Sequence, residues 1–302
     1  MQWTVERGGP VTTNLRIQYD RKNGWEQWGL LTADRHVDNP HSDLKLQKLH
    51  LDQAKERDAF VLDFGDFFDA MQGKTDRRAS KRDLFARFAA QASIEDDGDI
   101  TRSYLNALVD YGAQFLAPYL NNLALIGEGN HETSVDNKLE YNLLDGLIRD
   151  LNRMGGHQVI RGGYRGWIRF LFKSADGGSV KMSRNGFYFH GSGGGGPVTK
   201  GVIQASRKAA YLTNADYVFT GHVHENWHFP LERVRLTNSG REVQETQHHI
   251  QLPTYKQEYL NQRDGWHVET GKGPKPLGAW WIRFYWSSRS ESIETQFIMA
   301  DR

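Results

Sequence analysis

The sequence contains no cysteine among its 302 residues. This absence excludes disulfide bonds, thiolate metal sites and cysteine nucleophiles, so a metal ion would need His, Asp, Glu or Asn ligands. A secreted fold held together by disulfides is excluded for the same reason. No apolar run approaches the roughly 20 residues that span a bilayer, and the first eight residues contain no apolar signal-peptide segment. We therefore expect a cytoplasmic protein that makes no membrane contact.

An excess of charge of either sign is also lacking, because the formal net charge is +1 at pH 7. The overall charge thus gives no argument for binding to nucleic acid or to a membrane, although a local basic groove stays open. Hydrophobic residues make up 38% and charged residues 25%, which is typical of a globular chain. No repeat or linker divides the sequence, so we expect one α/β domain over residues 1–302.

Short apolar runs between amphipathic segments predict buried strands that alternate with helices. Strands are predicted at 28–33, 59–64, 123–126, 167–172, 186–189 and 215–219, and helices at 43–57, 103–119, 137–154 and 201–211. Residues before 24 predict an irregular lead-in or an edge strand. Residues 229–302 predict a β-rich completion of the domain, with a final strand pair at 279–286 and 292–298. Trp280 and Trp281 are adjacent, so in a strand they face opposite sides and at least one belongs to the core.

Five of the apolar runs end in short polar motifs that are rich in metal-binding atoms. In α/β sheets, ligands bind outside the carboxyl ends of the strands, so these motifs are expected to meet at one sheet edge. Mixed imidazole and oxygen ligands suit Mn, Fe, Zn, Co or Ni better than Mg or Ca. Seven ligands exceed what one ion needs, whereas two ions that share a carboxylate would use them all. The candidate ligands are Asp34, His36, Asp66, Asn130, His190, His222 and His224.

Each motif taken alone has an ordinary structural interpretation. Asp34 and His36 could be loop residues, Asp66 and Asp69 could cap a helix, and Asn130 could belong to a turn. A single histidine after a strand, such as His190, is common. The occurrence of all the motifs in one chain favours the metal site. The neighbouring loop residues Asp38, His41 and Asp43 are interpreted as solvated, with substrate contact as the alternative, and His228, His248, His249 and His267 as structural.

The order of the motifs resembles the calcineurin-like metallophosphoesterase superfamily. The matching elements are Asp34-x-His36, Gly65-Asp66-x-x-Asp69, Gly129-Asn130-His131-Glu132, His190-Gly191 and Gly221-His222-x-His224. The resemblance implies a four-layer α/β/β/α sandwich with mixed sheets and a motif core at about 28–228. It also implies two ions at the sheet edge. The first would be bound by Asp34, His36, Asp66 and His224, and the second by Asp66, Asn130, His190 and His222.

The resemblance further implies how the site would work. A hydroxide that bridges the two metals would attack phosphorus, and His131 would give a proton to the leaving oxygen or stabilise the transition state. Asp69 would orient His131. The expected cofactors are two divalent transition-metal ions, with Mn as the first choice and Fe, Zn, Ni or Co as alternatives.

The superfamily contains enzymes with several kinds of substrate. Protein phosphatases of the superfamily carry arginines where this chain has Ala70 and Glu128. This departure favours hydrolysis of a phosphodiester in a nucleotide or nucleic acid, with a DNA nuclease among the options. The alternatives are a phosphomonoesterase and a non-catalytic scaffold that binds proteins. The sequence leaves the substrate and the oligomeric state open.

Two other segments could contribute to substrate binding. Residues 71–101 form a candidate insertion that shapes the substrate cleft. Their basic cluster, Arg77-Arg78 and Lys81-Arg82, could contact nucleic acid or belong to a surface salt network. The run Gly193 to Gly196 could bring backbone N–H groups close to a phosphate or could be a surface loop.

Overall fold

Two mixed β-sheets form the centre of the protein. The computed structural model describes residues 2–70, 100–155, 158–177, 181–194, 196, 198–259 and 266–301. One sheet has six strands, in the spatial order β13 (Ser292–Met299), β12 (Trp280–Ser287), β3 (Glu26–Thr32), β4 (Phe60–Asp63), β5 (Leu123–Ile126) and β6 (Ile160–Arg161). The other has seven, in the order β1 (Trp3–Gly9), β2 (Thr12–Tyr19), β7 (Arg165–Ser174), β8 (Lys181–Phe189), β9 (Tyr217–Thr220), β11 (Glu242–Gln251) and β10 (Trp227–Leu236).

The strand directions decide where the polar motifs meet. In the six-stranded sheet, β3, β4, β5 and β6 are parallel neighbours. In the seven-stranded sheet, β8 pairs in parallel with β9, and β9 pairs in parallel with β11. Parallel neighbours end at the same edge of a sheet, so the segments that follow β3, β4 and β5 leave the sheet side by side.

An aromatic-rich core fills the space between the two sheets. Strand β4 is buried along its whole length, as expected for a parallel strand that is covered on both faces. Phe60 and Leu62 point between the sheets, where Phe60 contacts Phe170 of β7. Val61 points the other way, toward the helices. The alternation of side chains along a strand therefore divides this short sequence between two cores.

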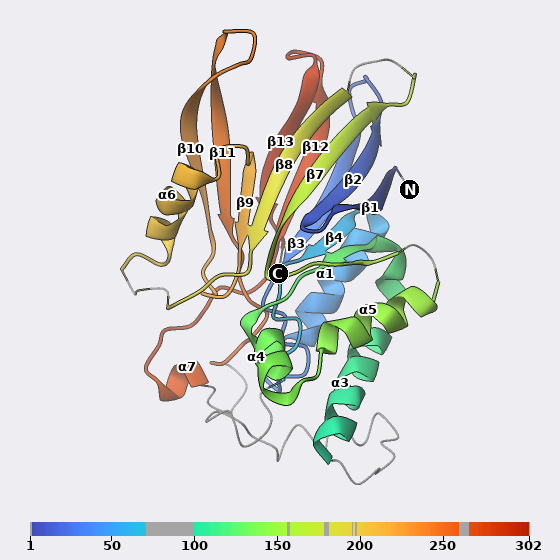
Figure 1. Cartoon of the computed structure of the whole chain (residues 1–302), viewed down its shortest axis with the longest axis vertical. Helices are drawn as coiled ribbons and strands as arrows, with labels where there is room; N and C mark the ends of the chain where they lie inside the picture. Colours follow the sequence, from blue (N-terminus) through green and yellow to red (C-terminus); the bar gives the residue numbers. More distant parts are fainter. Residues whose placement is uncertain are drawn as a thin grey trace.

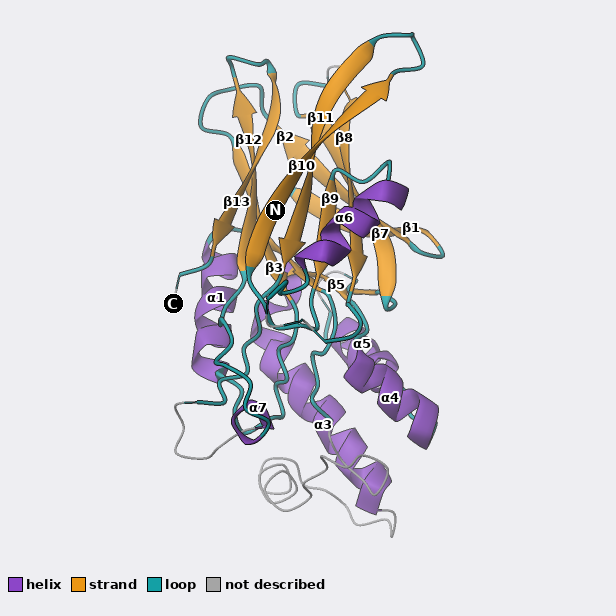
Figure 2. Cartoon of the chain, turned by 90° about the vertical axis from the view of Figure 1, so that its left-hand side faces the viewer, coloured by secondary structure: helices purple, strands orange, loops and turns teal. Residues whose placement is uncertain are grey.

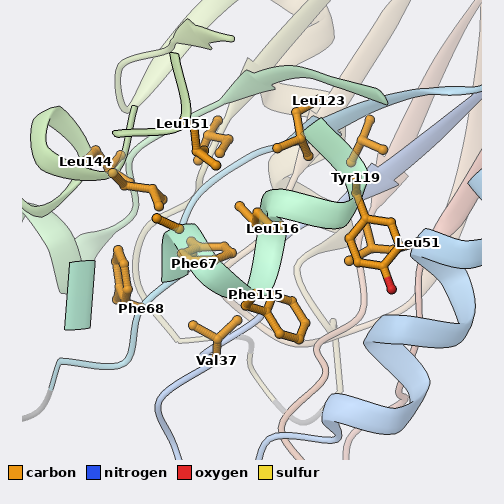
Figure 3. Packing of buried hydrophobic residues seen from close by; sticks show 14 of the residues in the cluster. Val37, Leu51, Phe67, Phe68, Phe115, Leu116, Tyr119, Leu123, Leu144 and Leu151 are labelled. Atoms are coloured by element: carbon orange, nitrogen blue, oxygen red, sulfur yellow. The ribbon is translucent and has the colours of Figure 1, made fainter. Parts of the chain in front are cut away.

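Helices cover the outer face of the six-stranded sheet. They are α1 (Leu44–Glu56), α3 (Ile100–Leu116) and α5 (Leu143–Arg153), and the 3-10 helix η1 (Ala117–Asn122) connects α3 to β5. Their apolar sides pack together around Leu51, Leu116 and Leu144 (Figure 3). Phe67 and Phe68 are fully buried in the same cluster. They follow Asp66 directly, so the loop that carries Asp66 is anchored in the core.

A single helix, α6 (Val202–Tyr211), covers the outer face of the seven-stranded sheet in the described part of the chain. Ala205 of this helix is buried, and Leu212, which follows it, packs against Phe187 and Val218 of the sheet. Figure 1 shows α6 on one side of the strands and α1, α3 and α5 on the other, and Figure 2 gives the view from the side of α6. The predicted α/β/β/α order of layers in one domain is confirmed.

The predictions made from the sequence are partly wrong for two segments. Before residue 24 it predicts at most an edge strand, but the structure has the edge strand β1 and also the interior strand β2, whose Leu15 and Ile17 enter the core. The single helix predicted at 137–154 is two helices, α4 (Asn130–Leu139) and α5. Glu140 takes a left-handed conformation at φ 52° and ends α4, and the Asn142 side chain caps α5.

Other predictions have clear outcomes. The Asp43 side chain caps α1 by accepting a hydrogen bond from the Leu46 N–H at 3.0 Å, so Asp43 has a structural role at the start of this helix. Trp281 is buried on the helix side of β12, and Trp280 packs against the inter-sheet core from the opposite face. Most of the segment 71–101, including its basic cluster, lies outside the described residues, as does Gly195. No helix among the described residues has the length and apolar character that crossing a membrane requires.

Candidate metal centre

All seven predicted ligands lie at the carboxyl ends of strands and come together in one place. Asp34 and His36 follow β3, Asp66 follows β4, and Asn130 is the first residue of α4, just beyond β5. From the other sheet, His190 follows β8, and His222 and His224 follow β9. Residues that are up to 190 positions apart in the sequence therefore share one site.

The first group of ligand atoms is formed by Asp34, His36 and His224. One ligand atom of each residue lies within 4.8 Å of the others. The Nε2 atoms of His36 and His224 are 3.4 Å apart, and His224 Nε2 is 3.2 Å from Asp34 Oδ1. The three side chains thus present an oxygen and two imidazole nitrogens to one small volume.

The second group is formed by Asp66, His190 and His222, whose ligand atoms also lie within 4.8 Å of one another. His190 Nε2 is 3.2 Å from Asp66 Oδ2. Asn130 Oδ1 lies 3.2 Å from His190 Nε2 and 2.6 Å from His222 Nδ1, so the amide belongs to this group as well.

The two groups are contiguous. Asp66 also forms a third set within 4.8 Å, together with His36 and His131. His190 Nε2 of the second group is 4.0 Å from Asp34 Oδ1 of the first. Asp66 therefore lies within reach of ligands from both groups, which is the position that a shared carboxylate requires.

The backbone at the site is strained. Asp34, His36, Asp66, His222 and His224 all have positive φ, between 45° and 72°. Such conformations cost of order 1–3 kcal/mol each for residues other than glycine and persist only where the surroundings enforce them. Hydrogen bonds hold this backbone in place. The N–H groups of Asp34 and His36 donate to the carbonyl oxygens of Gly65 and Asp66, at 2.9 and 3.0 Å, and the His222 N–H donates to Asp34 Oδ2 at 2.8 Å.

Two glycines of the motifs leave room for the carboxylates. A Cβ on Gly129 would overlap Asp66 Oδ1, and a Cβ on Gly221 would lie 2.7 Å from Asp34 Oδ2. Any side chain at these positions would displace a candidate ligand. The glycines in Gly129-Asn130 and Gly221-His222 therefore have a steric explanation.

The electrostatics of the site favour a bound cation. Burial opposes ionisation of Asp34 and Asp66, but neighbouring imidazoles, including that of His190, lower the pKa of both carboxyls. Burial lowers the pKa of His36 and His224, which favours the neutral, metal-binding form. For His190, the adjacent Asp66 outweighs burial and raises the pKa to about 10. The carboxylates thus attract positive charge, either as a proton or as a metal ion.

The residues present fit a transition-metal ion. Asp34 Oδ1 and His224 Nδ1 are buried and make no hydrogen bond. Buried polar atoms without a hydrogen bond are costly, and a cation bound between Asp34 Oδ1 and the nearby His224 Nε2 would remove that cost. Imidazole nitrogens combined with carboxylate and amide oxygens, without sulfur, are the ligand types that suit Mn, Fe, Co, Ni or Zn.

His131 lies next to the ligands on the second residue of α4. Its Nδ1 is 2.5 Å from the backbone carbonyl oxygen of Asp69, and its Nε2 is 3.7 Å from Asp66 Oδ2. The resemblance implies that Asp69 orients His131, and the group of Asp69 that contacts the His131 ring is its backbone carbonyl. The Asp69 carboxylate is farther from His131 Nδ1, at 4.0 Å, and lies 3.1 Å from His36 Nδ1.

Three residues near the site were not predicted from the sequence to be functional. Lys256 Nζ is 3.4 Å from Asp69 Oδ1 and 3.1 Å from Glu258 Oε1. Glu258 Oε2 is 2.8 Å from His267 Nδ1, and the His267 ring contacts the His224 ring edge-on at 5.7 Å. These residues lie in no recognisable motif. The chain approaches the site here because Thr254 Oγ1 and the Tyr255 N–H both donate to the carbonyl oxygen of Asp34.

Two buried carboxylates hold the loop that contains Asp66 and Asp69. Glu132 accepts hydrogen bonds from the N–H groups of Asp66, Phe68 and Gly129, and burial together with Asp66 raises its pKa to about 8. Asp38 accepts from the N–H groups of Asp69 and Ala70 and is fully buried. The interpretation of Asp38 as a solvated loop residue is therefore wrong.

Comparisons with known proteins give structural similarity only. No family model matches the chain, and no curated protein sequence matches it. One similar solved structure is a candidate 5′-nucleotidase from Staphylococcus aureus, which is 12% identical to this chain. The match covers 91% of this chain and 54% of the nucleotidase, with a TM-score of 0.45. This chain therefore spans about half the length of that protein.

Two further structures cover more of their own length. One is the calcineurin-like phosphoesterase YfkN from Bacillus subtilis, which is 10% identical; the match covers 91% of this chain and 90% of YfkN, with a TM-score of 0.38. The other is vacuolar protein sorting 29 from Cryptosporidium parvum, which is 12% identical; the match covers 92% of this chain and 100% of that one, with a TM-score of 0.35. In the order of its five motifs and in the meeting of their side chains at the carboxyl ends of strands from both sheets, the chain resembles the calcineurin-like metallophosphoesterase superfamily.

Proposed function

We propose that this protein hydrolyses phosphate esters with two bound divalent transition-metal ions. The observation that supports the proposal best is the pair of contiguous ligand groups around Asp66, each of which brings three ligand atoms within 4.8 Å of one another. A site built only for structure would need neither two such groups nor five strained ligand residues.

The ligands divide between the ions as follows. Asp34, His36, Asp66 and His224 would hold the first ion, and Asp66, Asn130, His190 and His222 the second. Bound ions of this kind provide Lewis acidity toward phosphoryl oxygens and lower the pKa of coordinated water. Manganese is the first candidate, because oxygen and imidazole ligands are mixed and sulfur is absent.

His131 is the candidate proton donor to the leaving oxygen. The carbonyl oxygen of Asp69 accepts a hydrogen bond from the Nδ1–H group of His131. This bond fixes the ring and turns Nε2 toward Asp66 and the ligand groups. Burial would lower the pKa of His131, but Asp66 and Asp69 outweigh it and raise the pKa. When it is protonated, the imidazole would deliver the proton on Nε2 to an ester oxygen bound beside Asp66.

We favour a phosphodiester as the substrate. Ala70 is buried and carries no charge, and the Glu128 carboxylate is paired with Arg161. Neither position therefore offers the positive charge that helps to bind a phosphate monoester with its two negative charges.

A substrate panel with controlled metal content tests this function. Purified protein is stripped with chelator, reconstituted with Mn²⁺, and assayed on bis-p-nitrophenyl phosphate, single- and double-stranded DNA, 2′,3′- and 3′,5′-cyclic nucleotides and a phosphomonoester. We expect metal-dependent cleavage of at least one diester. Cleavage of the monoester alone would contradict the phosphodiester preference. If the protein bound no transition metal and cleaved nothing, a protein-binding scaffold would replace the enzymatic proposal.

A further inference from the structure

A small pocket adjoins the metal centre on the side of α6. Its volume is about 30 Å³, enough for about two water molecules. Gly191 and Gly221 form part of its wall, and they directly follow His190 and directly precede His222. The pocket thus shares two turns with the second group of ligands. Its lining also includes Lys208, Thr220, Trp227 and Gln251.

Lys208 is a buried cation in this pocket without an anionic partner. Its exposed fraction is 9%. Its ammonium group lies 5.0 Å from the centroid of the Phe189 ring, and no acidic side chain among the described residues pairs with it. Burial lowers the pKa of Lys208 to about 8, so the group is still mostly protonated at pH 7. Burying a charge without a partner is costly, and the cost falls when an anion binds beside it.

Several of the other polar groups that line the pocket already make hydrogen bonds within the protein, and the His249 ring contacts Gln247 in this way. Gln251 Oε1 accepts a hydrogen bond from Thr220 Oγ1 at 2.9 Å, and Gln251 Nε2 donates to the carbonyl oxygen of Gly221 at 2.7 Å. Trp227 Nε1 donates to the carbonyl oxygen of Lys200 at 2.9 Å. No Asp or Glu lines the pocket. The chemistry of the lining therefore matches an anion brought by a ligand.

We propose that the Lys208 pocket binds a second anionic group of the substrate, a phosphate or a carboxylate carried beside the scissile phosphoester. The assignment rests on the proposed phosphoesterase function. The ammonium group would donate to the oxygens of this group, and the proximity of the His190 and His222 turns would let one molecule occupy both the pocket and the metal centre. Substrates with adjacent anionic groups, such as an oligonucleotide or a bisphosphorylated nucleoside, have this chemistry.

The test compares substrates that differ only in the second charge. One pair is thymidine 5′-(p-nitrophenyl phosphate) with and without a 3′-phosphate, and the other is p-nitrophenyl phenyl phosphate with and without a 4-carboxylate on the phenyl ring. In at least one pair, we expect wild-type KM to be about tenfold lower for the substrate with the extra charge, equivalent to about 1.4 kcal/mol of binding. In Lys208→Met this preference should disappear, with kcat changed less than twofold.

Two further variants separate charge from structure. Arg207→Met removes an exposed charge from the neighbouring position of α6 and should keep the preference. Lys208→Arg retains the charge and should keep most of it, provided that its melting temperature matches that of the wild type. If the wild type cleaves both members of each pair with equal KM, or if Lys208→Met keeps the preference, the inference is wrong while the phosphoesterase function stands. If nothing is cleaved, the proposed function itself fails.

A second measurement tests whether the pocket binds a free anion instead of a group of the substrate. Trinitrobenzenesulfonate modifies deprotonated lysines, and mass spectrometry of the peptides gives the rate at Lys208. Millimolar sulfate that protected Lys208, without any substrate preference in the kinetic assay, would assign the pocket to a free anion and overturn the assignment to substrate.

Discussion

The two groups of candidate ligands are supported by different kinds of contact. Behind the first group, the charged side chains of Asp69, Lys256 and Glu258 form a series. It begins beside His36 and ends beside His267, whose ring contacts His224. Both histidines of the first group are thus linked to the same series of charges.

Neutral groups support the second group. His190 Nδ1 lies 2.9 Å from the carbonyl oxygen of Phe64, and the ring of Tyr164 contacts the His190 ring edge-on. The Tyr164 hydroxyl donates to the carbonyl oxygen of Gly191 at 2.7 Å. Asn130 approaches both histidines of the group through its amide oxygen.

This difference separates the motif core from the rest of the chain. The supports of the second group lie within residues 28–228, whereas Lys256, Glu258 and His267 lie beyond it. The segment that follows β11 therefore completes the surroundings of the first group. Substitutions there are expected to affect the first ion and leave the second nearly unchanged, as outer contacts of a metal ligand tune the affinity of that ligand.

The largest effect is expected from Asp66→Asn, which weakens the residue that both groups share. Metal content should fall in both sites, and turnover should fall by more than about 10³-fold, because several kcal/mol of transition-state stabilisation are lost with the ions. Elemental analysis and hydrolysis of bis-p-nitrophenyl phosphate measure the two quantities. Retention of both ions with full activity would show that Asp66 is not shared.

His131→Asn should separate chemistry from metal binding. Loss of a positioned proton donor lowers turnover by about 10²–10⁴-fold, while metal content should stay at the wild-type value because His131 is not assigned as a ligand. If the metal content also fell, His131 would be a metal ligand. The structure allows this outcome, because His131 forms a set of possible ligand atoms with His36 and Asp66.

Lys256→Met tests the charged series behind the first group. Substitution of such outer residues typically costs about 10–100-fold in metal affinity or activity, and we expect the loss to affect one of the two ions. Lys256→Arg keeps the charge and should recover part of the affinity. Titration of stripped protein with Mn²⁺ resolves the two sites, and equal weakening of both would contradict the division between the groups.

Tyr164→Phe is the smallest perturbation and addresses the second group. It removes one hydrogen bond to Gly191, which corresponds to about 0.5–1.5 kcal/mol, so the affinity for one ion should fall by roughly threefold. The same titration measures it. If the ion affected by Lys256→Met were also the one affected by Tyr164→Phe, the two groups would not be independent.

The sequence predicted most of this site for a physical reason. Asp34 and Asp66 each follow a short apolar strand of the six-stranded sheet, and parallel strands end at a common edge, so local patterns were enough to bring these two together. His222 follows a strand of the other sheet and joins them because the two sheets pack face to face. The strands themselves were recognisable because β4 and β9 are buried along their whole length.

What the sequence missed depends on tertiary contacts. Lys256 and Glu258 reach the site because the backbone at Thr254 and Tyr255 bonds to Asp34, and no local pattern records that contact. The break between α4 and α5 depends on the left-handed conformation of Glu140, a residue type without a preference for it. Lys208 has the sequence context of an ordinary surface lysine and is buried because α6 packs on the seven-stranded sheet, where the ammonium group lies over the Phe189 ring.

Metal stoichiometry tests the central claim most directly. Wild-type protein and the variants His222→Ala and His224→Ala are stripped, reconstituted with Mn²⁺, freed of excess metal and analysed by mass spectrometry for manganese per chain. We predict two ions in the wild type and one in each variant, because His222 and His224 belong to different groups. A single ion in the wild type, or two ions retained in both variants, would contradict the two-metal site.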